Sequence, residues 1–185
     1  MKDQRLLDRS RRLALAGEGT ALERARGLCR AAARILITRV EGGRPHYQEA
    51  VELLRLATRL LRAEVGRSHP LMAMAHWLLG EALLCGGRPG DAARALIEAL
   101  SIGEAARWRP GCPCDNIVCD DLMACAQRLA DGSLLEWARA RRHEKGYCSC
   151  YRMTMWPGVR LESESVERVA GIPLPPGLQD LPSRQ

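Results

Sequence analysis

Six of the eight cysteines of this chain lie between residues 112 and 150, which makes this segment the first candidate for chemistry. Thiolates are common zinc ligands, and four complete a tetrahedral site. The local candidates are Cys112, Cys114, Cys119 and Cys125, with Cys148, Cys150 or His143 able to replace one of them. Paired Cys-x2-Cys knuckles are absent. We therefore expect reduced, partly buried thiols, with zinc binding as one alternative and redox or intermolecular disulfide roles as another.

The histidines and acidic residues form no catalytic pattern. A nucleophilic Cys or Ser needs a base such as His beside it, and none of the four histidines has a recognisable partner spacing; they are His46, His69, His76 and His143. His69 precedes Pro70 and is expected to serve the start of a helix. Asp120 and Asp121 suit the first turn of a helix, where the dipole favours acidic side chains. We expect no catalysis.

The composition predicts that helices carry these side chains. The 185 residues, 46% hydrophobic and 27% charged, fit one compact domain or a short helical array. Leu, Ala, Arg and Glu supply the bulk of the chain and lose little side-chain freedom in a helix. Phe is absent and aromatic residues total 4%, so the core must be aliphatic. A sheet protein would be richer in β-branched and aromatic residues.

The net charge of +6 is unevenly distributed, since residues 1–67 hold 15 basic and 8 acidic side chains. Such a block could face an acidic partner or phosphate, or it could be a solvated helix face whose Arg methylenes cover apolar neighbours. The N-terminus lacks the apolar run of a secretory signal, and no window approaches the 18 apolar residues of a membrane span. We expect a cytoplasmic or nuclear protein without membrane contact.

Apolar residues recur at spacings of three and four along several segments, as amphipathic helices require. Two predicted helices cover residues 6–15 and 20–40, and two later ones cover residues 117–129 and 133–142. Between them we expect a helix with Ala50 to Leu61 on one face that ends near Val65, a helix that Ser68-His69-Pro70 opens and Gly86 ends, and a helix that carries Ala92 to Leu100. Gly-Gly-Arg-Pro breaks the pattern twice, at 42–45 and again at 86–89. The acidic-Ala pairs that follow, Glu49-Ala50 and Asp91-Ala92, lie 42 residues apart. This internal repeat predicts a two-helix unit that buries its apolar face by stacking on its neighbours.

Residues 68–103 carry a distinctive pattern of breaks and small side chains. Its members are Ser68-His69-Pro70-Leu71-Met72-Ala73, Leu79-Gly80, Gly86-Gly87-Arg88, Ala92, Leu96 and Ala99-Leu100. The pattern resembles a tetratricopeptide repeat of the longer kind found in kinesin light chains. The resemblance implies that Gly80 lies where two helices cross closely, and that Ala92 and Ala99 let the second helix pack against the first.

The resemblance extends to the preceding unit, and it covers residues 20–106. There Ala50 and Ala57 match the two alanines of the later unit, and Leu36 stands in the place of the helix-crossing glycine. In the first helix of the later unit, His76 and Leu83 stand where the family usually has aromatic residues. The resemblance implies two, or with the Cys-rich segment three, stacked helix pairs.

A second resemblance supplies the alternative function. A similar helix pair, whose first helix begins with His-Pro, occurs in the C-terminal helical domain of SET- and MYND-domain lysine methyltransferases. The Cys-x-Cys-x4-Cys spacing from Cys112 to Cys119 is similar to the zinc-binding segment that follows SET domains. No Gly-x-Gly-x-x-Gly occurs, and too few strand-forming runs remain for a catalytic SET fold. The alternative is therefore a truncated or divergent relative that keeps only the helical domain.

The favoured function is a non-catalytic scaffold that binds a peptide segment of a partner protein in a helical groove. By resemblance, the groove-lining stripe of residues 70–85 is Met74, Trp77, Glu81 and Leu84. Met and Trp suit peptide recognition, although Trp77 could instead pack beneath an adjacent helix. Arg30 and Arg34 would bind acidic residues of the same peptide. The chain has too few aromatic residues to stack on nucleic-acid bases, and it contains no recognisable nucleic-acid-binding domain. Both observations argue against nucleic acid as the partner.

The predicted organisation is thus all-α, in three parts. Residues 1–106 form tetratricopeptide-like helical repeats with an N-terminal capping helix. Residues 107–157 form a Cys-rich segment with a further helix pair, and residues 158–185 form a disordered tail in which several prolines accompany few large residues.

Overall fold

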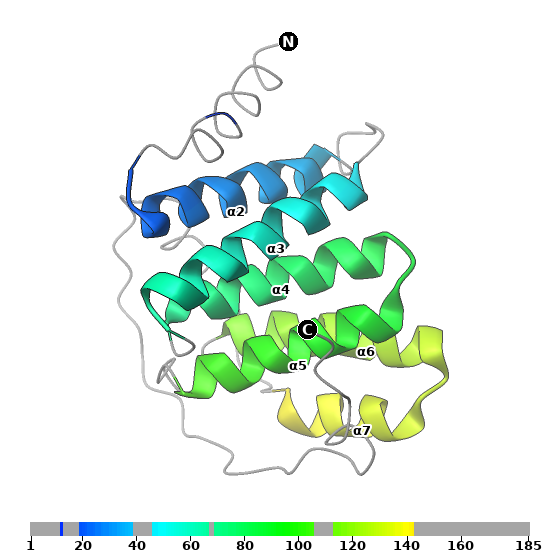
Figure 1. Cartoon of the computed structure of the whole chain (residues 1–185). Coiled ribbons are helices and arrows are strands. Elements are labelled where there is room, and N and C mark those ends of the chain that lie inside the picture. Colours follow the sequence, from blue (N-terminus) through cyan, green and yellow to red (C-terminus); the bar gives the residue numbers. More distant parts are fainter. Residues whose placement is uncertain (1–11, 13–18, 39–45, 67–68, 106–112, 143–185) are drawn as a thin grey trace. The chain divides into compact units, whose positions relative to one another are not determined.

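The computed structural model describes residue 12 and residues 19–38, 46–66, 69–105 and 113–142. Every regular element within these ranges is a helix, so the all-α prediction is confirmed for them. The helices are α2 (Ala21–Thr38), α3 (Tyr47–Glu64), α4 (Pro70–Cys85), α5 (Pro89–Ala105), α6 (Pro113–Leu129) and α7 (Gly132–Arg141) (Figure 1). The chain divides into a first unit, Met1–Trp108, which contains α2 to α5, and a second unit, Arg109–Gln185, which contains α6 and α7.

Local side-chain contacts fix where the helices of the first unit begin. At α2, the Thr20 N–H donates to Glu23 Oε2 over 2.9 Å, and the Glu23 N–H donates to Thr20 Oγ1 over 3.2 Å. This reciprocal pair is a capping box, which satisfies backbone donors that the first turn leaves free. At α4, His69 Nδ1 accepts from the Leu71 N–H over 3.1 Å, and Pro70 is the first helical residue. The expected role of His69 at a helix start is confirmed.

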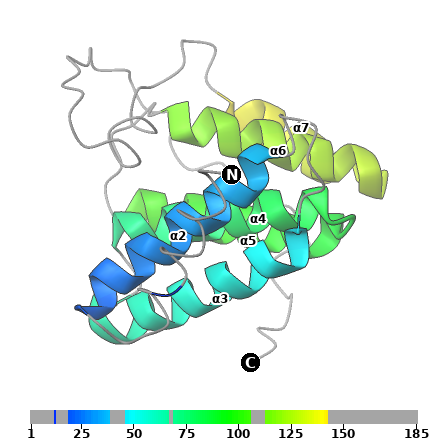
Figure 2. The same cartoon turned by 90° about the horizontal axis from the view of Figure 1, so that it is seen from above.

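The four helices of the first unit pack in chain order. α2 contacts α3, α3 contacts α4, and α4 contacts α5 (Figures 1 and 2). α2 also contacts α4. Twelve of the sixteen residues of α4 are buried, whereas α3 buries only one face. A helix that is apolar all round is stable only when it is covered all round. α4 is therefore the central element of this unit.

The small residues expected at helix contacts are buried. Gly80 lies on α4 against α5, and a Cβ built on it would lie 2.5 Å from Leu96 Cγ and 3.3 Å from the Ala92 carbonyl oxygen. Leu96 is fully buried, as are four alanines of the second helices: Ala50, Ala57, Ala92 and Ala99. α4 and α5 thus approach each other at a distance that leaves room for no side chain at residue 80.

The described residues of the second unit form a helix pair, as expected from residues 117–129 and 133–142. α6 begins earlier than expected, at Pro113, and α7 begins where the Asp131 carboxylate accepts from the Leu134 N–H over 2.9 Å. Arg142 Nε lies 2.9 Å from Asp120 Oδ1, which joins the end of α7 to α6. The expected capping helix at residues 6–15, apart from residue 12, and the expected disordered tail lie outside the described residues.

His76 is a half-buried polar side chain of α4. Both of its ring nitrogens are shielded from solvent, and neither has a hydrogen-bond partner among the described residues. Burial is the largest influence on the pKa of His76 and lowers it; the carboxylate of Glu98 raises the pKa, and the guanidinium of Arg62 lowers it. The net result is a pKa below the ordinary value, because a charged imidazole would lose its hydration in this position.

We predict that Gly80→Ala destabilises the protein. The added methyl group must displace the fully buried Leu96, and overpacking of this kind costs about 1–3 kcal/mol, against a gain of about 1 kcal/mol from helix propensity. The matched control is Gly90→Ala on α5, where a Cβ meets nothing within 4 Å. Urea unfolding should show a lower free energy of unfolding for Gly80→Ala than for Gly90→Ala, and the reverse order would contradict the close crossing.

We predict that His76 makes the fold acid-sensitive. Its pKa is lower in the folded chain than in the unfolded chain, where it is about 6.5. The unfolded chain therefore takes up this proton first, so stability is complete above about pH 6.5 and falls as the pH drops below that value. Melting curves of wild type and His76→Leu between pH 7.5 and 5 should show a smaller acid-induced loss for the variant. The exposed His46→Gln variant is the control, and equal losses in wild type and His76→Leu would refute the prediction.

Candidate functional site

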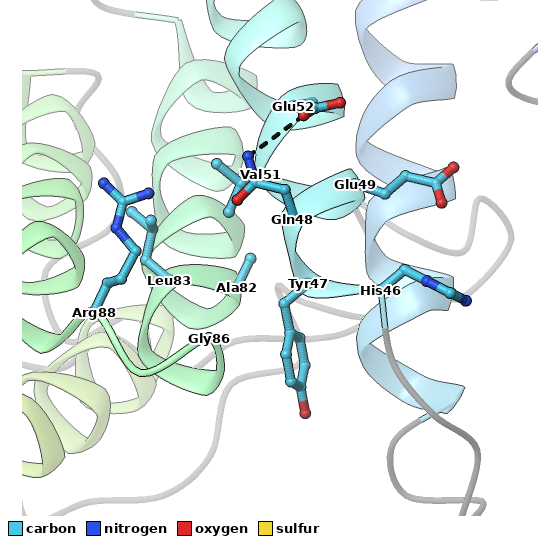
Figure 3. A pocket seen from close by; sticks show the side chains of 10 residues that line it. All are labelled: His46, Tyr47, Gln48, Glu49, Val51, Glu52, Ala82, Leu83, Gly86 and Arg88. Atoms are coloured by element: carbon cyan, nitrogen blue, oxygen red, sulfur yellow. Dashed lines mark hydrogen bonds between the residues drawn. The ribbon is translucent and has the colours of Figure 1, made fainter.

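The first unit has a pocket of about 580 Å³ where the start of α3 meets the end of α4 (Figure 3). Its floor is apolar and comes from buried side chains of both helices, and its rim is polar. The lining residues are His46, Tyr47, Gln48, Glu49, Val51, Glu52, Ala82, Leu83, Gly86 and Arg88. None of them is a cysteine or serine, so this pocket offers no thiol or serine hydroxyl for covalent catalysis.

The polar groups of the pocket do not converge on one point. In Figure 3, His46 and Glu49 point to one side, the Tyr47 ring points to another, and Arg88 lies across the pocket from Glu49. Gln48 Nε2 donates to Glu52 Oε1 over 3.4 Å, a weak contact along one face of α3. An acid and a base must share hydrogen-bond reach of one reacting atom to act together. These polar groups therefore do not form an acid–base pair aimed at one point in this pocket.

Arg88 is engaged by a neighbouring carboxylate. Its Nε donates to Asp91 Oδ2 over 2.8 Å, and Arg94 pairs with the other carboxylate oxygen of Asp91. Burial by itself would raise the pKa of Asp91, but the hydrogen bonds from the two guanidinium groups bring the pKa below its ordinary value. This cluster holds the first turn of α5 in place, and Asp91 also suits the positive end of the helix dipole.

The predicted groove stripe on α4 is mostly inside the protein. The exposed fractions of Met74, Trp77 and Leu84 are 6%, 9% and 6%. Only Glu81, the fourth member of the stripe, is partly exposed. This burial agrees with the alternative in which Trp77 packs beneath a neighbouring segment, and it leaves Glu81 as the stripe residue that a partner could contact directly.

The arginines predicted to accompany the groove lie on the outside of α2. Between residues 24 and 36, the exposed side chains are Arg26, Arg30 and Arg34, and the others are buried or half-buried. The three arginines follow one another at a spacing of four, so they share one edge of the helix. Sequence reasoning named Arg30 and Arg34. It missed Arg26, although the same four-residue spacing could have revealed it.

Most of the described cysteines are buried. Cys29, Cys119 and Cys125 are buried, and Cys85 is half-buried. Burial raises the pKa of Cys29 to about 12. Burial, with a smaller contribution from the charge of Asp121, raises the pKa of Cys125 to about 12 as well. Such thiols stay protonated near neutral pH and are poor nucleophiles.

The predicted zinc ligands lie only partly within the described residues. Cys112 and the Cys114 side chain fall outside them, whereas Cys119 and Cys125 are both on α6. A spacing of six residues separates two helix positions by about 9 Å along the axis and about 120° around it, so these two thiols leave α6 in different directions. No three potential ligands cluster among the described residues. Zinc binding stays a prediction.

No family model, curated protein or solved structure matches this chain. Within the described ranges, none of the helices has the length and apolar character needed to cross a membrane.

Proposed function

We propose that the first unit is a protein-interaction module in which two tetratricopeptide-like helix pairs, α2–α3 and α4–α5, bind a segment of a partner protein without catalysis. The observation that carries the proposal is the order of helix contacts. Each helix packs on the next, and α2 also contacts α4. In stacked helix pairs, the first helices of neighbouring pairs meet in this way and leave an extended surface for binding.

The alanines at corresponding positions of the two pairs support the same proposal. Ala50 and Ala57 on α3 are fully buried, as are Ala92 and Ala99 on α5. Each alanine in α3 precedes its counterpart in α5 by 42 residues. The close approach at Gly80 gives the second pair the small-residue crossing that the resemblance implies. The site chemistry agrees, because three of the four described thiols are buried, Cys85 is half-buried, and the pocket groups point apart.

The proposed binding surface combines Glu81 on α4 with Arg30 and Arg34 on α2. Glu81 is partly exposed on a helix that is otherwise nearly all buried, and the two arginines are exposed. Met74, Trp77 and Leu84 act in this proposal as the buried apolar layer that holds α4 rigid beneath Glu81. A rigid surface loses little conformational entropy when a peptide binds to it.

We predict that the full chain selects peptides of defined sequence. Random 15-residue peptides displayed on phage should converge on a shared motif, and a synthetic peptide of that motif should bind with a Kd on the order of 1 µM by calorimetry, about −8 kcal/mol. Glu81→Arg should weaken this binding at least tenfold. Glu98→Arg, which makes the same charge change at an exposed position of α5, should leave it within threefold.

Circular dichroism and melting curves of both variants should match wild type, so that a change in binding reports the surface and not the fold. Peptides that enrich equally on urea-unfolded protein, or no enrichment at all, would refute the interaction module. Equal binding by Glu81→Arg and Glu98→Arg would instead remove Glu81 from the binding surface.

A further inference from the structure

The exposed edge of α2 has an unusual composition. Over the thirteen residues from Arg24 to Leu36, the exposed positions are 26, 30 and 34, and all three are arginine. The opposite side of α2 packs into the first unit through fully buried small and apolar side chains, among them Ala25, Leu28 and Ala32. α2 is therefore an embedded helix that presents a single narrow edge, and that edge is basic along its whole length.

The α2 edge is also short of acidic neighbours on its own helix. Glu23, the acidic residue of α2, lies at the start of the edge, and its carboxylate already accepts hydrogen bonds from the Thr20 N–H and hydroxyl. The charge of Arg26 lowers the pKa of His69, after the larger effect of burial. A row of like charges on one helix edge repels itself by a small amount at each i,i+4 pair.

The spacing of the three arginines defines the shape of that partner. Eight residues of helix separate Arg26 from Arg34 by about 12 Å, with Arg30 halfway between them. A partner helix with carboxylates at i, i+4 and i+8 repeats this spacing of about 6 Å. Each guanidinium offers a planar fork of donors that matches a carboxylate in two-point contact.

We propose that Arg26, Arg30 and Arg34 form a docking edge for an acidic helical segment of a partner protein, and that charge complementarity along α2 selects this partner. The inference rests on the proposed interaction module and names the chemistry of what it binds. A nucleic acid is the less favoured occupant, because single strands are held largely by aromatic stacking and α2 contains no aromatic residue.

The docking edge is tested with full-length protein and a fluorescein-labelled, Ala-rich helical peptide that carries Glu at i, i+4 and i+8. Fluorescence anisotropy should show binding at 50 mM NaCl that weakens at least fivefold at 300 mM, because ions screen exposed charges. The same peptide with Gln in place of Glu should bind at least tenfold more weakly. A duplex DNA and a single-stranded RNA of matched length are the competing probes.

Two triple variants that each remove three positive charges locate the site. Arg26→Gln with Arg30→Gln and Arg34→Gln changes α2, and Arg55→Gln with Arg59→Gln and Arg62→Gln changes exposed positions on α3. We expect the α2 variant to lose at least tenfold in affinity for the Glu peptide and the α3 variant to lose less than threefold, with equal helix content in both.

Each contrary outcome overturns the docking edge in its own way. Equal losses in the two triple variants would mean that only the net charge attracts the peptide. Equal binding of the Glu and Gln peptides would remove the charge complementarity, and tighter binding of DNA or RNA would make the edge a nucleic-acid contact. If phage-selected peptides still bind the α2 triple variant as tightly as wild type, the interaction module stands, and the docking edge falls together with the place of Arg30 and Arg34 in the binding surface.

Discussion

The close crossing of α4 and α5 at Gly80 is the constraint on which the first unit depends. With no side chain at residue 80, the backbone of α4 approaches Leu96 and the Ala92 carbonyl closely enough that an added Cβ would clash. This approach brings the two helices together along their small residues, and it leaves α4 with the opposite side free to pack against α3 and α2. The aliphatic composition follows, since Leu and Ala fill a core in which helices lie this close.

α4 shows how burial all round limits what a helix can do. Because it is covered on nearly every side, its polar residues are few, and both ring nitrogens of the half-buried His76 are unpaired among the described residues. α2 differs, since it keeps one exposed edge, on which Arg26, Arg30 and Arg34 lie.

Much of the fold could be predicted from the sequence because its signals are local. The breaks at Pro70 and at Gly86-Gly87 mark helix ends directly, and the small residue at 80 indicates a close crossing. The burial of Trp77 could not be predicted, because an apolar stripe on a helix faces either a groove or another segment, and only packing decides between them. Arg26 was missed for a different reason: its spacing was visible, but its exposure depends on how the rest of α2 is buried.

Native-state hydrogen exchange of the full chain, read residue by residue by NMR, tests most directly whether α4 is the central helix that the crossing holds in place. Amides buried inside a cooperative unit exchange only when the whole unit opens. The amides of Leu78, Leu79 and Gly80 should therefore be among the slowest of the first unit, together with those of Leu96 and Ala99. Exchange in α4 as fast as that at the first turn of α2, while the rest of the unit stays protected, would contradict this account.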